Sequence, residues 1–496
     1  MKYRRFTAVL LGLSMFLTGC GSTADHINNK QNTTESVSEE FATEPMLTQA
    51  AAPAAAETAP ITVAAETTAA ATDGNENTTS QPTDSSSGSN NSSSSEKSEQ
   101  SQQSYNEPSH EEYTPTVTAA AYVHTSKHST ANTTTAKRMT TTTTTTCKAT
   151  PESVLKKMTL KQKVCQMFMV TPEAITGISP MVEVGNGTKK AMAEYPVGGI
   201  IYFAQNLSSR NQIKTMISNT QSFSREACGV GIFTGIDEEG GKVARCADKL
   251  GTTAFRSMEY YGSENNYNTA YDIGSTLAKD LRSLGFNVNF APVADVNINK
   301  GNELGDRIFS SDPEVVANMV CGVSKGLQDN GVSSTLKHFP GLGAESGNTH
   351  TNSTVVIDRT LDELRSTEFV PFKKGIDNGT DFVMVGHMSV TSFGDQLPCD
   401  LSYKAVTEML RGELGFKGIA ITDAQQMFTI SQVYSSGEAA KLSIKAGIDI
   451  ILMPVDYRAA VDEVCRAVES GEISEKRIDE SVMRILERKE KLGLLK

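Results

Sequence analysis

The sequence predicts an α/β fold, a single (β/α)8 TIM-like barrel over residues 148–496, preceded by a long linker rich in Ser and Thr. Two observations carry this prediction. The composition changes sharply near Cys147, and after it eight short apolar runs alternate with longer stretches of helical period. This alternation is the signature of repeated βα units around a parallel sheet. A doubly wound sheet is the alternative, because it shares the same alternation.

The first 20 residues, MKYRRFTAVLLGLSMFLTGC, combine a short basic segment with an apolar run too short to span a membrane. Small residues precede Cys20, and the segment resembles a bacterial lipoprotein signal. This implies cleavage before Cys20, lipid attachment to its sulfur, and a mature protein tethered at the extracellular face of the cell membrane. The alternative is an ordinary secretory signal with an incidental cysteine.

Residues 21–147 are dominated by Ser, Thr, Ala, Asn, Gln and Glu, with a threonine run that ends at Thr146. Such a composition has too little apolar area to offset chain entropy, so we expect a disordered linker that holds a domain away from the membrane. The formal net charge is −12, without clusters of Lys and Arg. Nucleic acid is therefore not an expected partner, and membrane contact is expected through the lipid anchor only.

The chain has eight cysteines, and those after Cys20 form no CxxC pair and have no histidine at ligand spacing. A metal site is therefore not expected. Several of these cysteines lie in apolar stretches and are expected to be buried, with no disulfide assignable. No cofactor is expected, because the glycine-rich loop after Pro340 lacks the following helix that would hold a pyrophosphate.

Eight apolar runs are the expected strands. In chain order they are 167–170, 198–203, 231–236, 288–293, 334–339, 382–387, 418–422 and 448–453. Between them, apolar residues recur with helical period over 209–227, 270–285 and 457–470.

A barrel places its chemistry at the C-terminal ends of its strands, and polar residues close or follow five of the expected strands. They are Asp237, Asp295, the pair Lys337 and His338, His387, and Asp423. We therefore expect these side chains to meet at one end of the barrel.

A series of motifs occurs in a fixed order: GGIIYFAQN, GIDEEGGKVAR, NVNFAPVADVN, GDRIFSSDP, KHFPG, VMVGH and GIAITDAQQM. In this order they resemble glycoside hydrolase family 3, in its β-N-acetylglucosaminidase branch, over Lys156–Lys496. The resemblance implies a TIM-like barrel and hydrolysis with retention of anomeric configuration. It also implies that the substrate is a terminal β-linked N-acetylglucosamine on cell-wall fragments or chitooligosaccharides.

Asp423 follows the strand 418–422 and matches the family's nucleophile. The resemblance implies that its carboxylate captures the anomeric carbon as a glycosyl-enzyme intermediate. The alternative is a carboxylate that caps a helix starting at AQQM, since Asp is a common N-cap residue.

Five other residues match the family's sugar-binding positions. Asp237 matches the acceptor of sugar hydroxyls, a task that suits a carboxylate because it can accept two charge-assisted hydrogen bonds. The matching donors are Arg245, Arg307, Lys337 and His338. For the two arginines, the alternative is a salt bridge to Glu239 or Asp306. For His387 we expect a structural role.

The loop after Lys337 departs from the family pattern. The branch usually carries KHFPGHG and then Asp-Ser-His, whereas this chain has Leu342 and Asn348, with His350, the matching acid/base, in place. An asparagine can orient an imidazole but cannot stabilise the imidazolium that forms when the proton is taken up. We therefore expect His350 to be less basic than in Asp-bearing relatives, with a lower pH optimum or weaker activity.

Three interpretations of this loop stay open. We favour His350 as the acid/base, alone or with Asn348 as its orienting partner. In the second, Glu345 supplies the carboxylate or serves as the acid itself, which is the commoner device in glycosidases. In the third, the enzyme is impaired.

The sequence thus favours an exo-acting β-N-acetylhexosaminidase that acts on a carbohydrate as a monomer. The alternatives are a phosphorylase, another β-glycosidase of the same family, or a sugar-binding lipoprotein that has lost its proton transfer. The chain has no Trp, so Tyr202, Phe203 and Phe339 are the aromatic candidates for contact with a sugar ring.

Overall fold

All eight predicted strands are present in the structure, a computed structural model that describes residues 149–344 and 355–495. They are β1 (Phe168–Val170), β2 (Gly199–Ile201), β3 (Phe233–Ile236), β6 (Val288–Asn289), β7 (Thr335–Phe339), β9 (Phe382–Val385), β11 (Ile419–Thr422) and β12 (Ile451–Leu452). Nearly all of their residues are buried because helices cover the outside and side chains fill the inside, which explains the continuous apolar runs.

The strands form a closed parallel barrel. Five strands pair in the order β12-β1-β2-β3-β6, and the other three pair in the order β7-β9-β11. Parallel bridges between Val288 and Ser333 and between Ile421 and Ile450 join these two groups. Closure excludes the doubly wound alternative and confirms the barrel prediction.

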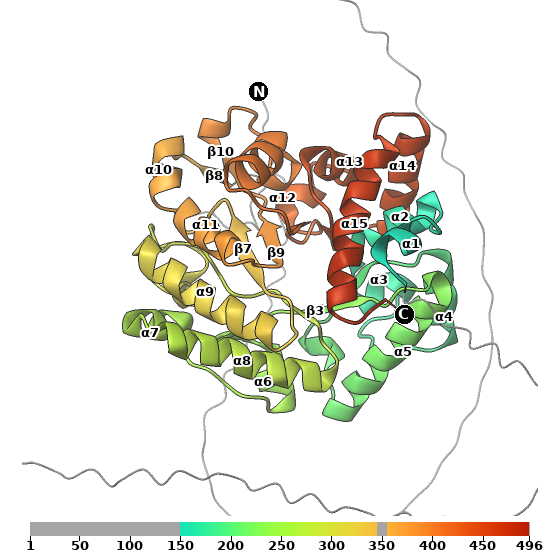
Figure 1. The fold of residues 1–496 in the computed structure, drawn as a ribbon, viewed down its shortest axis with the longest axis horizontal. Helices are drawn as coiled ribbons and strands as arrows, with labels where there is room; N and C mark the ends of the chain where they lie inside the picture. Colours follow the sequence, from blue (N-terminus) through green and yellow to red (C-terminus); the bar gives the residue numbers. More distant parts are fainter. Residues whose placement is uncertain (1–148, 345–354, 496) are drawn as a thin grey trace, which may run out of the picture. The chain divides into compact units, whose positions relative to one another are not determined.

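The predicted helices flank the strands (Figure 1). They are α5 (Arg210–Cys228), α8 (Tyr267–Leu284) and α14 (Tyr457–Glu469). The other α-helices are α1 (Pro151–Leu155), α2 (Leu160–Gln166), α3 (Pro172–Thr176), α4 (Asn186–Glu194), α6 (Arg245–Leu250), α7 (Met258–Glu264), α9 (Pro313–Asp329), α10 (Leu361–Ser366), α11 (Phe369–Asp377), α12 (Phe428–Ser431), α13 (Ser436–Ala446) and α15 (Glu475–Lys491). A π-helical segment spans Lys404–Glu413.

Local sequence signals set the bounds of α5. Ser209 caps its N-terminus, where the hydroxyl accepts from the Gln212 N–H at 3.1 Å, and Gly229 ends it with a φ of 77°. The buried residues Ile213 and Ile217 lie four apart, so they share the face that packs on the barrel.

Two short pairs of strands lie outside the barrel. The antiparallel β4 (Glu238–Gly240) and β5 (Val243–Ala244) follow β3, and the parallel β8 (Val356–Ile357) and β10 (Ser389–Val390) lie beyond β7 and β9. Glu239 lies in β4 of the first pair, and its side chain forms part of the site described below.

Several predictions fall on residues outside the described ranges: the signal segment with Cys20, the linker 21–147, and Glu345, Asn348 and His350. Within 149–344 and 355–495, no helix has the length and apolar character needed to cross a bilayer. The cysteines described there are free, and four of them are buried, as expected: Cys165, Cys246, Cys321 and Cys399.

Candidate active site

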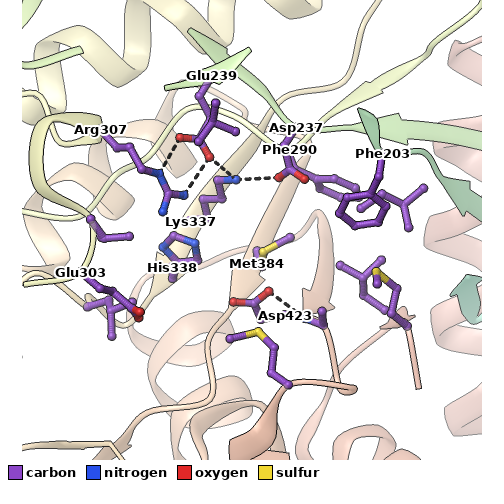
Figure 2. A pocket seen from close by; sticks show the side chains of 18 of the residues that line it. Phe203, Asp237, Glu239, Phe290, Glu303, Arg307, Lys337, His338, Met384 and Asp423 are labelled. Carbon is purple, nitrogen blue, oxygen red and sulfur yellow. Dashed lines mark hydrogen bonds and ion pairs between the residues drawn. The ribbon is translucent and has the colours of Figure 1, made fainter. Parts of the chain in front are cut away.

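A cavity of about 340 Å³ opens at the C-terminal ends of the barrel strands (Figure 2). The polar and charged residues that line it are Asp237, Glu239, Arg245, Glu303, Arg307, Lys337, His338 and Asp423. Four of them lie at or just after the ends of barrel strands, where the sequence predicted chemistry to gather: Asp237, Lys337, His338 and Asp423. The cavity is therefore the candidate active site.

Lys337 is the centre of an ion network on one wall of the cavity. Its ammonium lies 2.9 Å from Asp237 Oδ1 and 2.6 Å from Glu239 Oε1, and its side chain is only 3% exposed. Arg307 forms two hydrogen bonds of 2.8 Å with the Glu239 carboxylate, and Arg245 donates to Asp237 Oδ2 at 2.9 Å. Figure 2 shows Lys337 between the two carboxylates.

This network fixes the charge of every member. Burial raises the pKa of Asp237 and of Glu239, but the Lys337 ammonium and the arginines outweigh it and hold both pKa values below the ordinary range. Burial lowers the pKa of Lys337, but the same two carboxylates raise it above its ordinary value. At neutral pH the wall is therefore an array of ionised donors and acceptors, suited to hydroxyl groups of a sugar.

His338 is held by a buried carboxylate below it. Asp295 accepts from the backbone N–H of His338 at 3.0 Å, lies 2.8 Å from its Nδ1, and accepts from the Leu342 N–H at 2.6 Å. A carboxylate at Nδ1 favours the tautomer that carries a proton there. The imidazole therefore presents Nε2 to the cavity in a fixed orientation.

Asp423 lies across the cavity from the ion network, next to His338 and Met384 (Figure 2). Its backbone N–H donates to Val385 O at 2.9 Å, and its Oδ1 accepts from the Ala424 N–H at 2.7 Å. Burial raises the pKa of Asp423, but the imidazoles of His338 and His387 outweigh it and hold the pKa below its ordinary value. Oδ2 accepts no hydrogen bond from the described residues, so one ionised oxygen faces the cavity.

His387 lies outside the cavity wall and supports Asp423 from below. Its Nδ1 is 3.0 Å from Asp400 Oδ1, its Nε2 is 3.0 Å from Ala424 O, and its side chain is fully buried. Burial lowers the pKa of His387, but the Asp400 carboxylate outweighs it and raises the pKa to about 9. The charged ring fixes the backbone next to Asp423, which agrees with the structural role expected for His387.

Comparison with known proteins identifies the family. The model of the glycosyl hydrolase family 3 N-terminal domain matches residues 159–488. The chain belongs to glycoside hydrolase family 3. This confirms the family expected from the order of the motifs.

Two curated proteins similar to this family 3 chain are bacterial. Beta-hexosaminidase A of Pseudoalteromonas piscicida is 32% identical over 326 residues, which are 61% of this chain and 54% of that protein. Beta-hexosaminidase of Nitrosomonas eutropha is 30% identical over 289 residues, 57% of this chain and 80% of that protein. The chain thus spans about half the length of the first relative and most of the second.

The family 3 barrel also resembles solved structures. A family 3 beta-N-acetylglucosaminidase from a Paenibacillus species superposes with a TM-score of 0.64 at 36% identity, covering 68% of this chain and 63% of that one. The structure of LpqI from Mycobacterium tuberculosis gives a TM-score of 0.59 at 28% identity, over 69% of this chain and 97% of that one.

The structure brings six of the predicted site residues of this family 3 chain into one cavity. They are Asp237, Arg245, Arg307, Lys337, His338 and Asp423. The predicted alternative for Asp423 is wrong, because no helix starts at AQQM: α12 begins at Phe428, with Met427 as its N-cap residue.

The ion-pair alternative for the arginines is correct in part. Arg307 pairs with Glu239 as expected, whereas Arg245 pairs with Asp237, and Asp306 pairs with Lys242 at 2.9 Å. Both arginines line the cavity as well, so salt bridging and access to a ligand are compatible here.

Sequence reasoning missed parts of the site. The sequence indicates Glu239 only as an ion-pair partner and Asp295 only as a residue at a strand end, and it indicates no role for Glu303. Of the three aromatic candidates only Phe203 lines the cavity, with the Arg245 guanidinium 4.8 Å from its ring centre. Tyr202 and Phe339 are fully buried in the core, and Phe290 takes a place in the wall instead.

Proposed function

We propose that this chain is an exo-acting, retaining β-N-acetylglucosaminidase, a β-N-acetylhexosaminidase that hydrolyses terminal β-linked N-acetylhexosamine from cell-wall fragments or chitooligosaccharides. One observation carries the proposal: Asp423 is an ionised carboxylate with one oxygen directed at a cavity whose opposite wall is built from charged donors and acceptors. The names of the relatives, beta-hexosaminidase and beta-N-acetylglucosaminidase, support this choice of substrate.

The first step forms a covalent intermediate. Asp423 Oδ2 attacks the anomeric carbon, the bond from that carbon to the leaving oxygen breaks, and the acid/base protonates that oxygen. Water then attacks the same carbon, the bond to Asp423 breaks, and the acid/base takes the proton of the water. Two inversions leave the configuration of the sugar unchanged.

The ion network binds the sugar that is attacked. Asp237 accepts hydrogen bonds from hydroxyl groups, while Lys337, Arg245 and Arg307 donate to hydroxyl oxygens. His338 presents Nε2 on the side of Asp423, where this nitrogen can accept a hydrogen bond from a sugar hydroxyl group. The members of the ion network hold one another and Asp295 holds His338, so these groups need little reorganisation when the ring flattens toward an oxocarbenium ion.

The proton transfer is assigned to the loop that follows Leu342. We assign the acid/base role to His350 and the role of its orienting partner to Asn348. Glu345 is the second candidate for the same proton transfer, because a carboxylic acid with a raised pKa is the usual acid of glycosidases.

The experiment measures release of a chromogenic aglycone from an aryl β-N-acetylglucosaminide by the wild type and by three variants. Asp423→Asn should abolish turnover, and undiminished turnover would refute the nucleophile assignment. His350→Ala should lower turnover most on substrates with poor leaving groups, and collapse in Glu345→Gln alone would move the acid/base role to Glu345. Added inorganic phosphate should not yield a sugar phosphate, and its formation would establish phosphorolysis.

We also propose that the chain is exported and anchored at the extracellular face of the membrane through a lipid on Cys20, with 21–147 as a disordered spacer. The signal-like segment and its small residues before Cys20 support this. Metabolic labelling with a fatty acid should mark the wild type and not Cys20→Ser. Equal labelling of the two would refute the anchor.

A further inference from the structure

A second cavity, of about 700 Å³, lies at the opposite end of the barrel from the active site. One side of it is formed by α5, and the other side is formed by the segment before β6 and by the end of α15. The residues that follow α15 contact the residues that follow α5, because the Gly231 N–H donates to Leu494 O at 2.8 Å. Figure 1 shows the end of α15 close to α5. Nothing in the proposed reaction uses this cavity.

The charges around this cavity have one sign. Four cationic side chains line it, Lys214 and Arg225 from α5, Arg282 from α8 and Lys491 from α15, and none of the lining residues that the structure describes is acidic. The chain as a whole carries a net charge of −12. A concave surface lined by one sign of charge concentrates ions of the opposite sign.

Arg225 is the residue that most requires a partner. Its Nε is buried, and the Nε–H donates no hydrogen bond within 149–344 and 355–495. Its guanidinium also forms no ion pair there, unlike the arginines of the active site. A buried donor without a partner costs free energy that an acceptor from a bound anion would offset.

Three polar side chains of α5 line the cavity, so a ligand could contact more than Arg225 alone. Lys214, Ser218 and Arg225 lie at positions 0, 4 and 11 of one helical face, so they form a row along the cavity. At 1.5 Å per residue, the row spans about 16 Å. A ligand with charges separated along a chain would contact both ends of the row.

Helix dipoles explain only part of this cluster. Arg282 and Lys491 lie in the last turns of α8 and α15, where a cation balances the carbonyl ends, and Arg282 donates to Asn330 O at 3.1 Å. Lys214 lies in the N-terminal half of α5, where the dipole gives a cation no support. Arg225 lies in the last turn of α5, where the dipole supports a cation, so Lys214 is the one described lining cation that no helix dipole supports.

We propose that this cavity is a binding site for a phosphate-bearing anion, held by Arg225 in its interior and by Lys214 and Lys491 at its margins. A guanidinium binds phosphate oxygens in a bidentate fashion, and the two lysines add point charges. The shared chemistry is the phosphate group, whether it comes from a small free anion or from a phosphate polymer.

Isothermal titration calorimetry of the full chain with pyrophosphate and with a short linear polyphosphate tests the site. We expect both to bind, and binding to weaken as NaCl is raised. Tighter binding of the polyphosphate would assign the site to a polymer, and equal or weaker binding would assign it to a small anion. No heat with either probe at low salt would overturn the proposal.

Matched variants locate the binding. Arg225→Gln should weaken binding by roughly tenfold or more, and Arg225→Lys should weaken it less. The double variant Lys214→Gln/Lys491→Gln should weaken binding about as much as Arg225→Gln does. Lys190→Gln, an exposed lysine of α4 outside the cavity, makes the same charge change and should leave binding unaltered. Equal losses in the α4 control and in Arg225→Gln would refute a defined site. Hydrolysis of the chromogenic substrate should be the same in all variants, since none of these residues lines the active site.

Discussion

Replacing Lys337 by methionine tests whether the active-site wall is held together by its buried charges. The ammonium contacts Asp237 and Glu239 at 2.9 and 2.6 Å and is almost wholly buried. Methionine keeps the length and apolar volume of the side chain and removes the charge. The two carboxylates then face each other with one arginine each.

The expected loss of stability follows from these contacts. Removing one partner of a buried ion pair costs about 3–5 kcal/mol because the other charge is left uncompensated. Here Arg245 and Arg307 still partner the carboxylates, so we expect the lower limit, about 3 kcal/mol. At about 2 °C per kcal/mol for a domain of this size, Tm should fall by about 6 °C.

The pH dependence gives a second readout. The lowered pKa values of Asp237 and Glu239 mean that their ion pairs stabilise the fold above the ordinary carboxyl pKa, about 4, and lose this contribution as the pH falls through the folded-state values. The difference between the variant and the wild type should therefore be greatest near pH 7 and shrink below about pH 4.

Urea unfolding, followed by circular dichroism, measures both effects. Lys325→Met is the matched control, because Lys325 forms an exposed pair with Asp329 on α9 at 2.5 Å. Because this pair is exposed to solvent, its loss should cost far less stability than the loss of Lys337. If Lys337→Met and Lys325→Met lose the same stability, or if the loss at Lys337 does not depend on pH, the ion network does not hold the wall.

Three further predictions concern buried positions. Burial disfavours a charged His387, yet its carboxylate partner raises the pKa to about 9 from 6.5; the resulting stabilisation is complete below pH 6.5 and is lost toward pH 9. Between these two pH values the unfolding free energy of the wild type should therefore fall by roughly 3 kcal/mol, as measured by urea unfolding at a series of pH values. His387→Gln should abolish this dependence on pH. Burial lowers the pKa of Lys489 to about 7 from 10.5, so its contribution to stability rises with pH across that window, and Lys489→Met should abolish the rise in the same assay. A Cβ at Gly262 would lie 1.8 Å from Phe309 O, so Gly262→Ala should lower the unfolding free energy by about 2 kcal/mol, whereas Gly187→Ala, which meets open space, should not.

The barrel was predictable because each strand is buried on both faces. Burial of this kind demands continuous apolar runs, and runs separated by helical periods leave few alternatives to a parallel sheet. The loop after β11 was not predictable in this way. Residues 424–427 suggested a helix start, but the Gln425 N–H donates to Leu452 O at 2.9 Å, so a tertiary contact replaces the first helical turn.

The sequence predicted which residues lie in the site, but it did not predict which of them contact one another. Asp237 follows β3 and Lys337 lies near the end of β7, and this placed both in the site, although they are 100 residues apart in the chain. Their partners were harder to find. Glu239 enters through the β4–β5 hairpin, and Asp295 acts from beneath His338, and neither placement follows from strand order alone.

The arrangement of charges separates the groups that bind the sugar from the group that attacks it. Asp237 and Glu239 are neutralised by direct contacts with Lys337, Arg245 and Arg307, which fixes them as hydrogen-bonding groups and lowers their nucleophilicity. Asp423 is kept ionised differently, by imidazoles that act at a distance, and its one direct contact, the Ala424 N–H, occupies only Oδ1. A carboxylate in a salt bridge would have to give up that contact in order to attack a carbon atom. Asp423 has none to give up within the described residues, so its position favours the proposed attack on the anomeric carbon.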